Sequence, residues 1–177
     1  MKSLIYGYGK TGKSFARFLE SKKYKFDIYD DNLPKYSKKI DLKKYNQILC
    51  SPGVPKNIFE KIRNINQNVL TDLDIFYINN PNNLKITITG TNGKSTTAKL
   101  LSNILKDQNK EVILAGNIGT PILSNSNIKP NTIFVIEASS YQIDYSQYFK
   151  TDYAFILNIS PDHLERHKSI QGYAHAK

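Results

Sequence analysis

A β-branched run that leads into a glycine-rich turn constrains the fold of this chain most strongly. Residues 86–89 predict a buried strand, and "GTNGKST" at 90–96 follows directly. The sequence then takes on helical spacing, with Ala98 and Leu101 on the apolar face. A strand, a glycine loop and a helix in this order bring backbone amides and a helix N-terminus to one place, where a phosphate can bind. The segment therefore predicts an α/β fold with a phosphate-binding loop.

The polar residues of this loop suit a nucleoside triphosphate. Lys94 would neutralise the β- and γ-phosphate oxygens, and the Ser95 hydroxyl would reach a bound Mg²⁺. The loop is shorter than the common GxxxxGK[ST] pattern, because Ile88 stands where that pattern has its first glycine. The predicted ATP-binding residues are Gly90, Thr91, Asn92, Gly93, Lys94, Ser95 and Thr96.

A second glycine-rich turn, "GYGKTG", occupies residues 7–12. An apolar run precedes it and an amphipathic segment at 13–22 follows it, so the glycines would let the backbone approach a phosphate at a helix N-terminus. A further apolar run ends in Asp30, about 20 residues later, where a carboxylate can hydrogen-bond a ribose hydroxyl. This spacing is typical of dinucleotide-binding proteins, so a nicotinamide-dependent dehydrogenase is one interpretation.

Short apolar and amphipathic segments continue to alternate along the chain and predict parallel βαβ units. Residues 46–50 and 68–70 predict strands, and residues 57–65 predict a helix between them. The polar, proline-containing stretch at 79–85 interrupts this pattern, which restarts before the phosphate loop. The first unit suits a mononucleotide better than a dinucleotide, since a full dinucleotide fold joins two such halves.

A length of 177 residues allows one large or two small domains. The interrupted pattern favours two α/β domains. We predict a Rossmann-like parallel-sheet domain at 1–80, a linker at 81–85 and the first part of a P-loop NTPase-like domain at 86–177.

Composition narrows the possible partners and the compartment. The net charge of +10 comes almost entirely from dispersed lysines, whereas a nucleic-acid surface favours clustered arginines. Cys50 is the single cysteine, which excludes an intrachain disulfide and suits a reducing cytoplasm. No apolar run approaches the ~20 residues that span a bilayer. We expect a cytoplasmic, soluble monomer without a nucleic-acid partner.

Polar side chains follow two further predicted strands. Glu137 comes directly after the apolar run 133–136, at an edge where parallel sheets collect their ligands. It could bind Mg²⁺ or order the water around the ion. Asn158, Asp162 and His163 follow the next apolar run, and His163 is a candidate ligand of a second metal ion.

Four motifs in one order connect this chain to a known family: "GTNGKST", "GNIG" at 116–119, "EASSYQ" at 137–142 and "NISPDHLERH" at 158–167. Together they resemble the Mur ligase family, and the short phosphate loop is that family's own form. With "GYGKTG" and "SPGVP" at 51–55, the chain is most similar to the family member that joins D-glutamate to UDP-N-acetylmuramoyl-L-alanine. The resemblance covers essentially all 177 residues.

The resemblance implies that the first domain binds the UDP group of that substrate, and that Asn117 contacts its sugar-peptide part. Asn32 stands where a cationic residue often follows the acidic pair, so we expect different uracil contacts there. The implied substrate-binding residues are Gly9, Lys10, Thr11, Asp30, Asp31, Ser51, Gly53, Asn117, Ser139 and Gln142.

The resemblance also implies ATP and two Mg²⁺ ions. Ser95 and Glu137 match the first metal site, and His163 matches the second. Lys177 matches a lysine that becomes a carbamate, which converts an ammonium into an oxygen ligand for the second ion. The implied catalytic residues are Lys94, His163 and Lys177.

The implied reaction is amide formation through an acyl phosphate, with no protein nucleophile. Family members continue through the rest of the ATP domain and a C-terminal domain that contacts D-glutamate. We therefore expect these 177 residues to be an N-terminal portion that is inactive alone. A dehydrogenase, another amide ligase such as a folylpolyglutamate synthase, and a binding fragment without catalytic activity remain alternatives.

Overall fold

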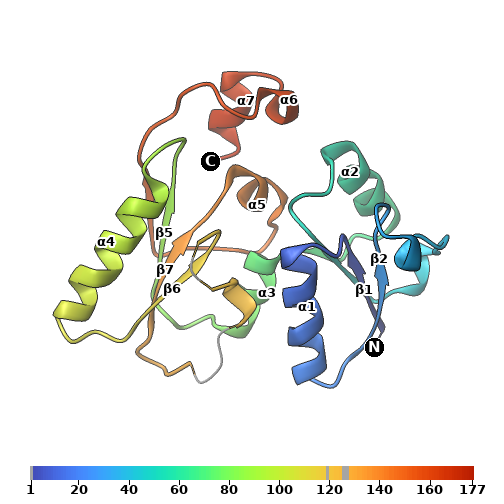
Figure 1. Ribbon diagram of the computed structural model, residues 1–177, viewed down its shortest axis with the longest axis horizontal. Helices are drawn as coiled ribbons and strands as arrows, with labels where there is room; N and C mark the ends of the chain where they lie inside the picture. The colour runs from blue at the N-terminus through green and yellow to red at the C-terminus, as the bar shows by residue number, and fades with distance from the viewer. Residues whose placement is uncertain (1, 119, 125–127) are drawn as a thin grey trace.

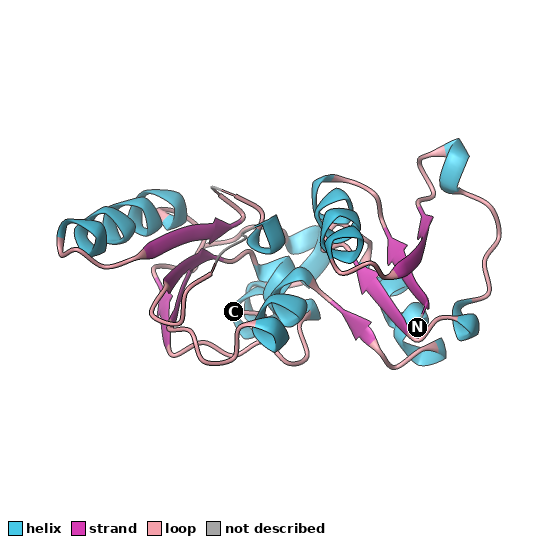
Figure 2. Ribbon diagram, turned by 90° about the horizontal axis from the view of Figure 1, so that it is seen from below, coloured by secondary structure: helices cyan, strands magenta, loops and turns pink. Residues whose placement is uncertain are grey.

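The computed structural model describes residues 2–118, 120–124 and 128–177. These residues form two parallel β-sheets that lie side by side, each with helices packed against it (Figure 1). Seen from below, the strands form two separate groups (Figure 2). No helix in the described part of the chain is long and apolar enough to cross a membrane. The prediction of an α/β fold with parallel sheets is confirmed.

The first sheet has the strand order β2-β1-β3-β4, and all its strand pairs are parallel. This order is that of flavodoxin-like doubly wound folds, which bind ligands beyond the carboxyl ends of β1 and β3. Its elements are β1 (Lys2–Tyr6), α1 (Lys10–Ser21), β2 (Lys25–Tyr29), β3 (Gln47–Cys50), α2 (Lys56–Ile65) and β4 (Val69–Leu70), with 3₁₀ helices at Pro34–Tyr36 and Leu42–Lys44.

Alternating strand residues explain why α1 and α2 cover opposite faces of the first sheet. Leu4 of β1 packs in one core cluster with Phe59 and Ile62 of α2. Its neighbour Ile5 packs in another cluster with Phe15 of α1. Successive strand residues point to opposite faces, so a strand with apolar residues at both positions needs a helix on each face.

The second sheet has the order β6-β7-β5-β8 and is also parallel throughout. Every residue of β5, the strand before the phosphate loop, is buried, and α4 lies against β5, β6 and β7. Its elements are β5 (Lys85–Thr89), α4 (Lys94–Asp107), β6 (Val112–Gly116), a 3₁₀ helix (Ile122–Ser124), β7 (Ile133–Glu137), α5 (Ser140–Tyr145), β8 (Tyr153–Ile156), α6 (Leu164–His167) and α7 (Ile170–His175).

Helix α3 (Asp72–Asn79) connects the two sheets and contributes to both cores (Figure 1). Ile75 packs with residues of the first sheet, whereas Leu73 and Phe76 pack with residues of the second. Thr71 and Asp74 cap the helix through reciprocal hydrogen bonds. The sequence patterns did not predict this helix, because its apolar residues are spread around it and form no amphipathic pattern, with Leu73 and Phe76 buried and Ile78 exposed.

The last residue of the predicted linker at 81–85 lies in a strand. Lys85 is the first residue of β5 and is buried. Its ammonium group donates hydrogen bonds to the carbonyl oxygens of Pro81 and Asn83, at 3.0 and 2.5 Å. Burial lowers the pKa of Lys85. The turn between α3 and β5 therefore folds around this side chain instead of forming a free connection.

Strand β8 is the outer strand of the second sheet and differs from its neighbours in burial. All four of its residues are exposed, among them Tyr153, Phe155 and Ile156. Parallel sheets are normally covered on both faces. The described residues leave β8 without the cover that β5 and β7 have.

Candidate functional site

A first cleft lies beyond the carboxyl ends of the first sheet. It has a volume of about 320 Å³ and is lined by the turns that follow β1, β2 and β3. Open parallel sheets bind ligands at this position. All seven of the UDP-binding residues predicted in this half line the cleft: Gly9, Lys10, Thr11, Asp30, Asp31, Ser51 and Gly53.

Two glycines of the first turn are required by the backbone conformation or by close packing. The third glycine lies beside open space. Gly7 has a φ of 87°, and a Cβ added at Gly12 would lie 2.1 Å from the Gly7 carbonyl oxygen. Helix α1 begins at Lys10, inside the turn that the sequence analysis placed before it. A Cβ at Gly9 would meet no described atom within 4 Å beyond its chain neighbours. Gly9 thus leaves room for a phosphate at the N-terminus of α1.

Asp30 holds the first glycine turn in place. Its Oδ2 accepts a hydrogen bond from the Tyr8 backbone N–H at 2.6 Å, and its Oδ1 accepts one from Asn32 at 2.9 Å. The Tyr29 hydroxyl donates to Asp31 at 2.5 Å. Carboxylate oxygens can accept more than one hydrogen bond, so both residues can still accept from a ligand hydroxyl. A ribose contact of Asp30 is predicted from the sequence, whereas its contribution to the turn is not.

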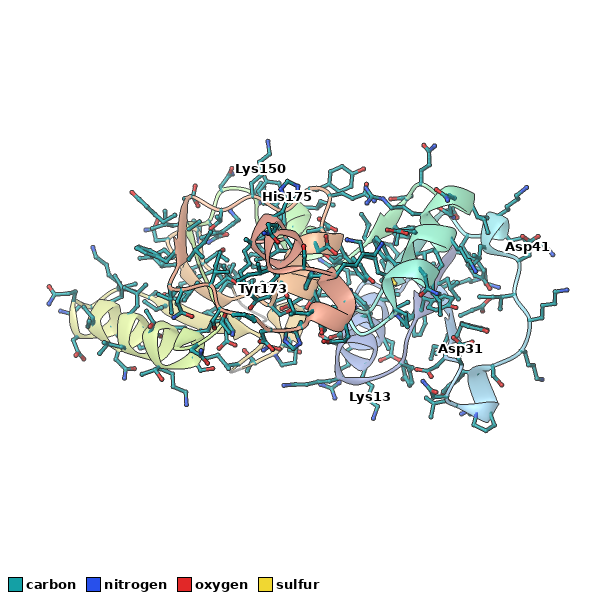
Figure 3. All side chains as sticks on the ribbon, turned by 90° about the horizontal axis from the view of Figure 1, so that it is seen from above. Lys13, Asp31, Asp41, Lys150, Tyr173 and His175 are labelled. Carbon is teal, nitrogen blue, oxygen red and sulfur yellow. The ribbon has the colours of Figure 1, made fainter. Side chains whose placement is uncertain are left out.

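A second cleft, of about 350 Å³, lies between the two halves of the molecule. Lys10, Thr11 and Gly53 line both clefts, which are therefore adjacent. In Figure 3, Tyr173 of α7 lies near the middle of the molecule and Asp31 toward the outer end of the first half. One elongated ligand can extend from the first cleft into the second. Six further predicted residues line the second cleft: Lys94, Asn117, Ser139, Gln142, His163 and Lys177.

The side chain of Asn158 braces the phosphate loop. It accepts a hydrogen bond from the Asn92 backbone N–H at 2.9 Å and donates one to the Asn92 carbonyl oxygen at 3.0 Å. The Lys94 ammonium donates to the carbonyl oxygens of Gly90 and Thr91, at 2.8 and 2.7 Å. The cation is therefore already placed over the loop in which phosphates would bind.

Ser95 and Glu137 meet at the carboxyl ends of β5 and β7. The Ser95 hydroxyl donates to Glu137 Oε2 at 2.8 Å, and the Asn117 amide donates to Oε1 at 3.2 Å. Glu137 is buried. Mg²⁺ typically takes one or two protein oxygens together with substrate phosphates and waters. This hydroxyl and carboxylate beside a phosphate loop fit such an ion, and their role as ligands remains a prediction.

His163 lies at the rim of the second cleft, with 45% of its side chain exposed. Its ring nitrogens lie 3.4 Å from an Asp162 oxygen and 3.6 Å from a Glu165 oxygen. Among the described residues, no three His, Cys, Asp or Glu side chains gather closely enough to hold a metal ion by themselves. A second metal site at His163 would therefore need ligands from substrate or from a modified Lys177, and it remains a prediction.

Lys177 reaches back to the phosphate loop. Its Nζ donates to Thr89 Oγ1 and to the Gly90 carbonyl oxygen, both at 3.0 Å. Burial, and then the nearby charge of Lys94, lower the pKa of Lys177 to about 8. A larger share of this amine is therefore neutral near physiological pH than for an ordinary lysine, and the neutral amine is the form that can react with CO₂.

The other residues that line the second cleft were not predicted as site residues from the sequence, and they include Asp72, Tyr141 and Tyr173. Asp72 stands two residues after β4, so the argument that identified Glu137 at a strand end could also have found it. The two tyrosines belong to short helices, and a single sequence contains no signal that separates them from packing residues.

The fold and the two clefts define an α/β protein of the nucleotide-binding type. The middle-domain profile of the Mur ligases matches residues 88–177, about half of the chain. The chain belongs to the Mur ligase family. Members of this family in general depend on ATP and require Mg²⁺. This assignment removes the basis for the dehydrogenase interpretation of the first glycine turn.

Curated relatives carry the name UDP-N-acetylmuramoylalanine–D-glutamate ligase. The protein from Rickettsia bellii (strain RML369-C) is 38% identical over 189 residues, and that from Francisella tularensis subsp. novicida (strain U112) is 38% identical over 183 residues. The matches cover 98% and 99% of this chain but 41% and 43% of the relatives. The chain thus spans about two fifths of their length.

A solved structure of another family member has a similar fold. It is the UDP-N-acetylmuramate:L-alanyl-γ-D-glutamyl-meso-diaminopimelate ligase from Neisseria meningitides, with a TM-score of 0.59 and 17% sequence identity. The match covers 99% of this chain and 66% of that chain. At this identity the likeness supports the fold alone.

Proposed function

We propose that this chain provides the UDP-sugar and ATP sites of a ligase that joins D-glutamate to UDP-N-acetylmuramoyl-L-alanine. The observation that carries the proposal is that Lys10, Thr11 and Gly53 line both clefts. UDP in the first cleft would place the peptide end of the same molecule in the second cleft, beside the phosphate loop. The names of the curated relatives support this choice of substrates.

The reaction has two steps. The alanyl carboxylate attacks the γ-phosphorus of ATP, the bond to ADP breaks, and an acyl phosphate forms. The amine of D-glutamate then attacks the acyl carbon, phosphate leaves, and the new amide nitrogen loses a proton. Phosphoryl transfer depends mainly on positioning and electrostatic stabilisation. We assign the stabilisation of phosphoryl charge to Lys94, whose ammonium lies over the loop.

The metal ligands are part of the same proposal. Ser95 and Glu137 would hold a Mg²⁺ ion, which neutralises phosphate charge when bound. His163 and Lys177 would contribute to a second site. For that role the Lys177 amine must add CO₂, which forms an N–C bond, releases one proton and leaves a carbamate.

Mass spectrometry tests the modification of Lys177 directly. Native spectra in bicarbonate buffer should show the mass of one added CO₂, and the Lys177→Arg variant should lack it. The Lys85→Arg variant is a control, because Lys85 is a buried lysine that lies away from both clefts. An unmodified wild-type mass would remove Lys177 from the second metal site.

The domain assignment follows from the two sites. We propose that residues 1–80 act as the UDP-binding domain and residues 86–177 as part of the ATP-binding domain, joined at 81–85. The exposed β8 edge and the greater length of the relatives favour a ligase whose turnover needs further residues, including those that contact D-glutamate. A reducing cytoplasm suits the free, buried Cys50. We also propose a monomer, which sedimentation can test.

Calorimetric titration with separate ligands tests the proposed sites. UDP and UDP-N-acetylmuramoyl-L-alanine should both bind, the larger ligand more tightly, and Mg²⁺–ATP should bind independently of UDP. Lys94→Ala should abolish ATP binding and leave UDP affinity unchanged. Binding of NADH without binding of UDP would overturn the proposal.

A further inference from the structure

One carboxylate in the second cleft has no part in the proposed reaction. Asp72 is the first residue of α3, and only 7% of its surface is exposed. Burial raises its pKa to about 6. Above that pH the side chain is an anion, which can only accept hydrogen bonds.

Asp72 accepts a hydrogen bond from Gln142, which belongs to the other half of the molecule. The Nε2 atom of Gln142 lies 3.0 Å from Asp72 Oδ2. At the other end of the same amide, Gln142 Oε1 accepts hydrogen bonds from the backbone N–H and the hydroxyl of Ser139, both at 3.1 Å. A flipped amide would place an oxygen against the carboxylate and a donor against the Ser139 N–H. The network therefore fixes the orientation of the amide.

One hydrogen of the oriented Gln142 amide is not used in this network. A glutamine nitrogen has two, and one of them goes to Asp72. The hydrogen bonds among the described residues include no acceptor for the second. Gln142 lines the second cleft, so this N–H can donate to an oxygen atom of a ligand there.

We propose that Asp72 is a positioning residue that orients the Gln142 amide toward the sugar-peptide part of the substrate. The free N–H would meet a carbonyl or hydroxyl oxygen beyond the diphosphate. This inference rests on the proposed function, because it takes a sugar nucleotide as the ligand. UDP alone would remain in the first cleft, which neither Asp72 nor Gln142 lines.

The two halves do not depend on this hydrogen bond for their contact. Lys56 of α2 forms an ion pair with Asp144 of α5 at 2.9 Å. The hydroxyl groups of Thr71 and Ser146 lie 2.9 Å apart. Lys56 lines neither the first nor the second cleft. Lys56→Ala is therefore a matched control, since it removes a contact between the halves at the same helix without changing the ligand site.

The affinities of two ligands distinguish a positioning role of Asp72 from a general loosening of the contact between the two halves. Asp72→Ala removes the acceptor of the Gln142 N–H. It should weaken binding of UDP-N-acetylmuramoyl-L-alanine by about tenfold, the effect of one misplaced hydrogen bond, and leave UDP binding unchanged. Lys56→Ala should leave both affinities unchanged. If Asp72→Ala changes neither affinity, or weakens both ligands equally, the positioning role is wrong. Failure of UDP to bind the wild type would instead contradict the proposed function.

A double substitution tests whether the ligand needs the glutamine N–H itself. In Asp72→Asn/Gln142→Glu, the new amide at 72 can donate to the new carboxylate at 142, which can still accept from Ser139. A double-mutant cycle in unfolding free energy verifies the restored contact. Sugar-peptide binding should stay weak, because the carboxylate offers no N–H to the ligand. Recovery of wild-type affinity would overturn the inference.

Discussion

Glu137 accepts a hydrogen bond from Ser95 across the carboxyl ends of β7 and β5, with 2.8 Å between Oε2 and Oγ. The contact joins a buried strand-end carboxylate to the first turn of α4. The two groups proposed for Mg²⁺ are thus held together by the fold. A site that is already organised loses less side-chain freedom when its ligand binds.

Replacing the carboxylate tests this pair. Glu137→Gln keeps the size of the side chain and can still accept from Ser95, but it lacks the negative charge. We expect Mg²⁺-dependent ATP affinity to fall at least about tenfold, with UDP affinity unchanged. Ser102→Ala is the control on α4, because its buried hydroxyl has no partner among the described residues. Equal ATP affinities for wild type and Glu137→Gln would contradict the metal assignment.

The first glycine turn predicts a contrast between two alanine substitutions. Gly12→Ala would place a Cβ 2.1 Å from the Gly7 carbonyl oxygen. We expect a loss of about 1–3 kcal/mol in unfolding free energy, measured as a lower urea midpoint at constant slope. Gly9→Ala should cost less, about 0.5–1 kcal/mol for alanine at the N-cap of α1, because its added Cβ would meet no described atom within 4 Å beyond its chain neighbours. Its added methyl should weaken UDP binding, and unchanged UDP affinity would argue against a phosphate at this position.

Asp72 predicts a pH-dependent effect on stability. Its folded pKa of about 6 lies above the ordinary value of 3.8, mainly because of burial, with a smaller rise from Asp74. The folded state therefore binds this proton more tightly, and the contribution of Asp72 to stability falls as the pH rises through this range. Asp72→Asn removes the titration. Its unfolding free energy relative to the wild type should rise by up to about 3 kcal/mol between pH 4 and pH 7. Urea titrations at both pH values measure the difference, and a constant difference would contradict burial of the charged form.

The position of Arg166 leads us to expect that two Arg→Lys substitutions differ in their effect on the unfolding free energy. Its guanidinium lies 4.0 Å from the ring centre of Tyr141 and 4.4 Å from that of Tyr145, and it donates to the Val54 carbonyl oxygen at 3.3 Å. Arg166→Lys keeps the charge but loses the planar stacking. We expect it to lower the unfolding free energy by about 1–2 kcal/mol. Arg17→Lys, at an exposed arginine, should change it by less than about 0.5 kcal/mol. Similar effects of the two substitutions in thermal or urea unfolding would show that the stacking contributes little.

The features that could be predicted from the sequence are those determined by residues adjacent in the chain. The phosphate loop and the strand-end Glu137 are recognisable because a few adjacent residues determine their geometry. Helix α3 was missed because its apolar residues are spread around the helix and form no amphipathic pattern. The contact between Asp72 and Gln142 depends on how the two sheets meet, and nothing in the local sequence around either residue specifies it. The same holds for the brace that Asn158 gives to the phosphate loop.

If the two clefts bind the two ends of one substrate, as we propose, their common wall of Lys10, Thr11 and Gly53 would make them a bivalent receptor. Once the diphosphate end of a substrate is bound, its other end is confined to a small volume beside the second cleft. Its effective concentration there can exceed any concentration of the free sugar-peptide in solution. UDP and a free muramoyl peptide added together should therefore not reproduce the affinity of the intact molecule.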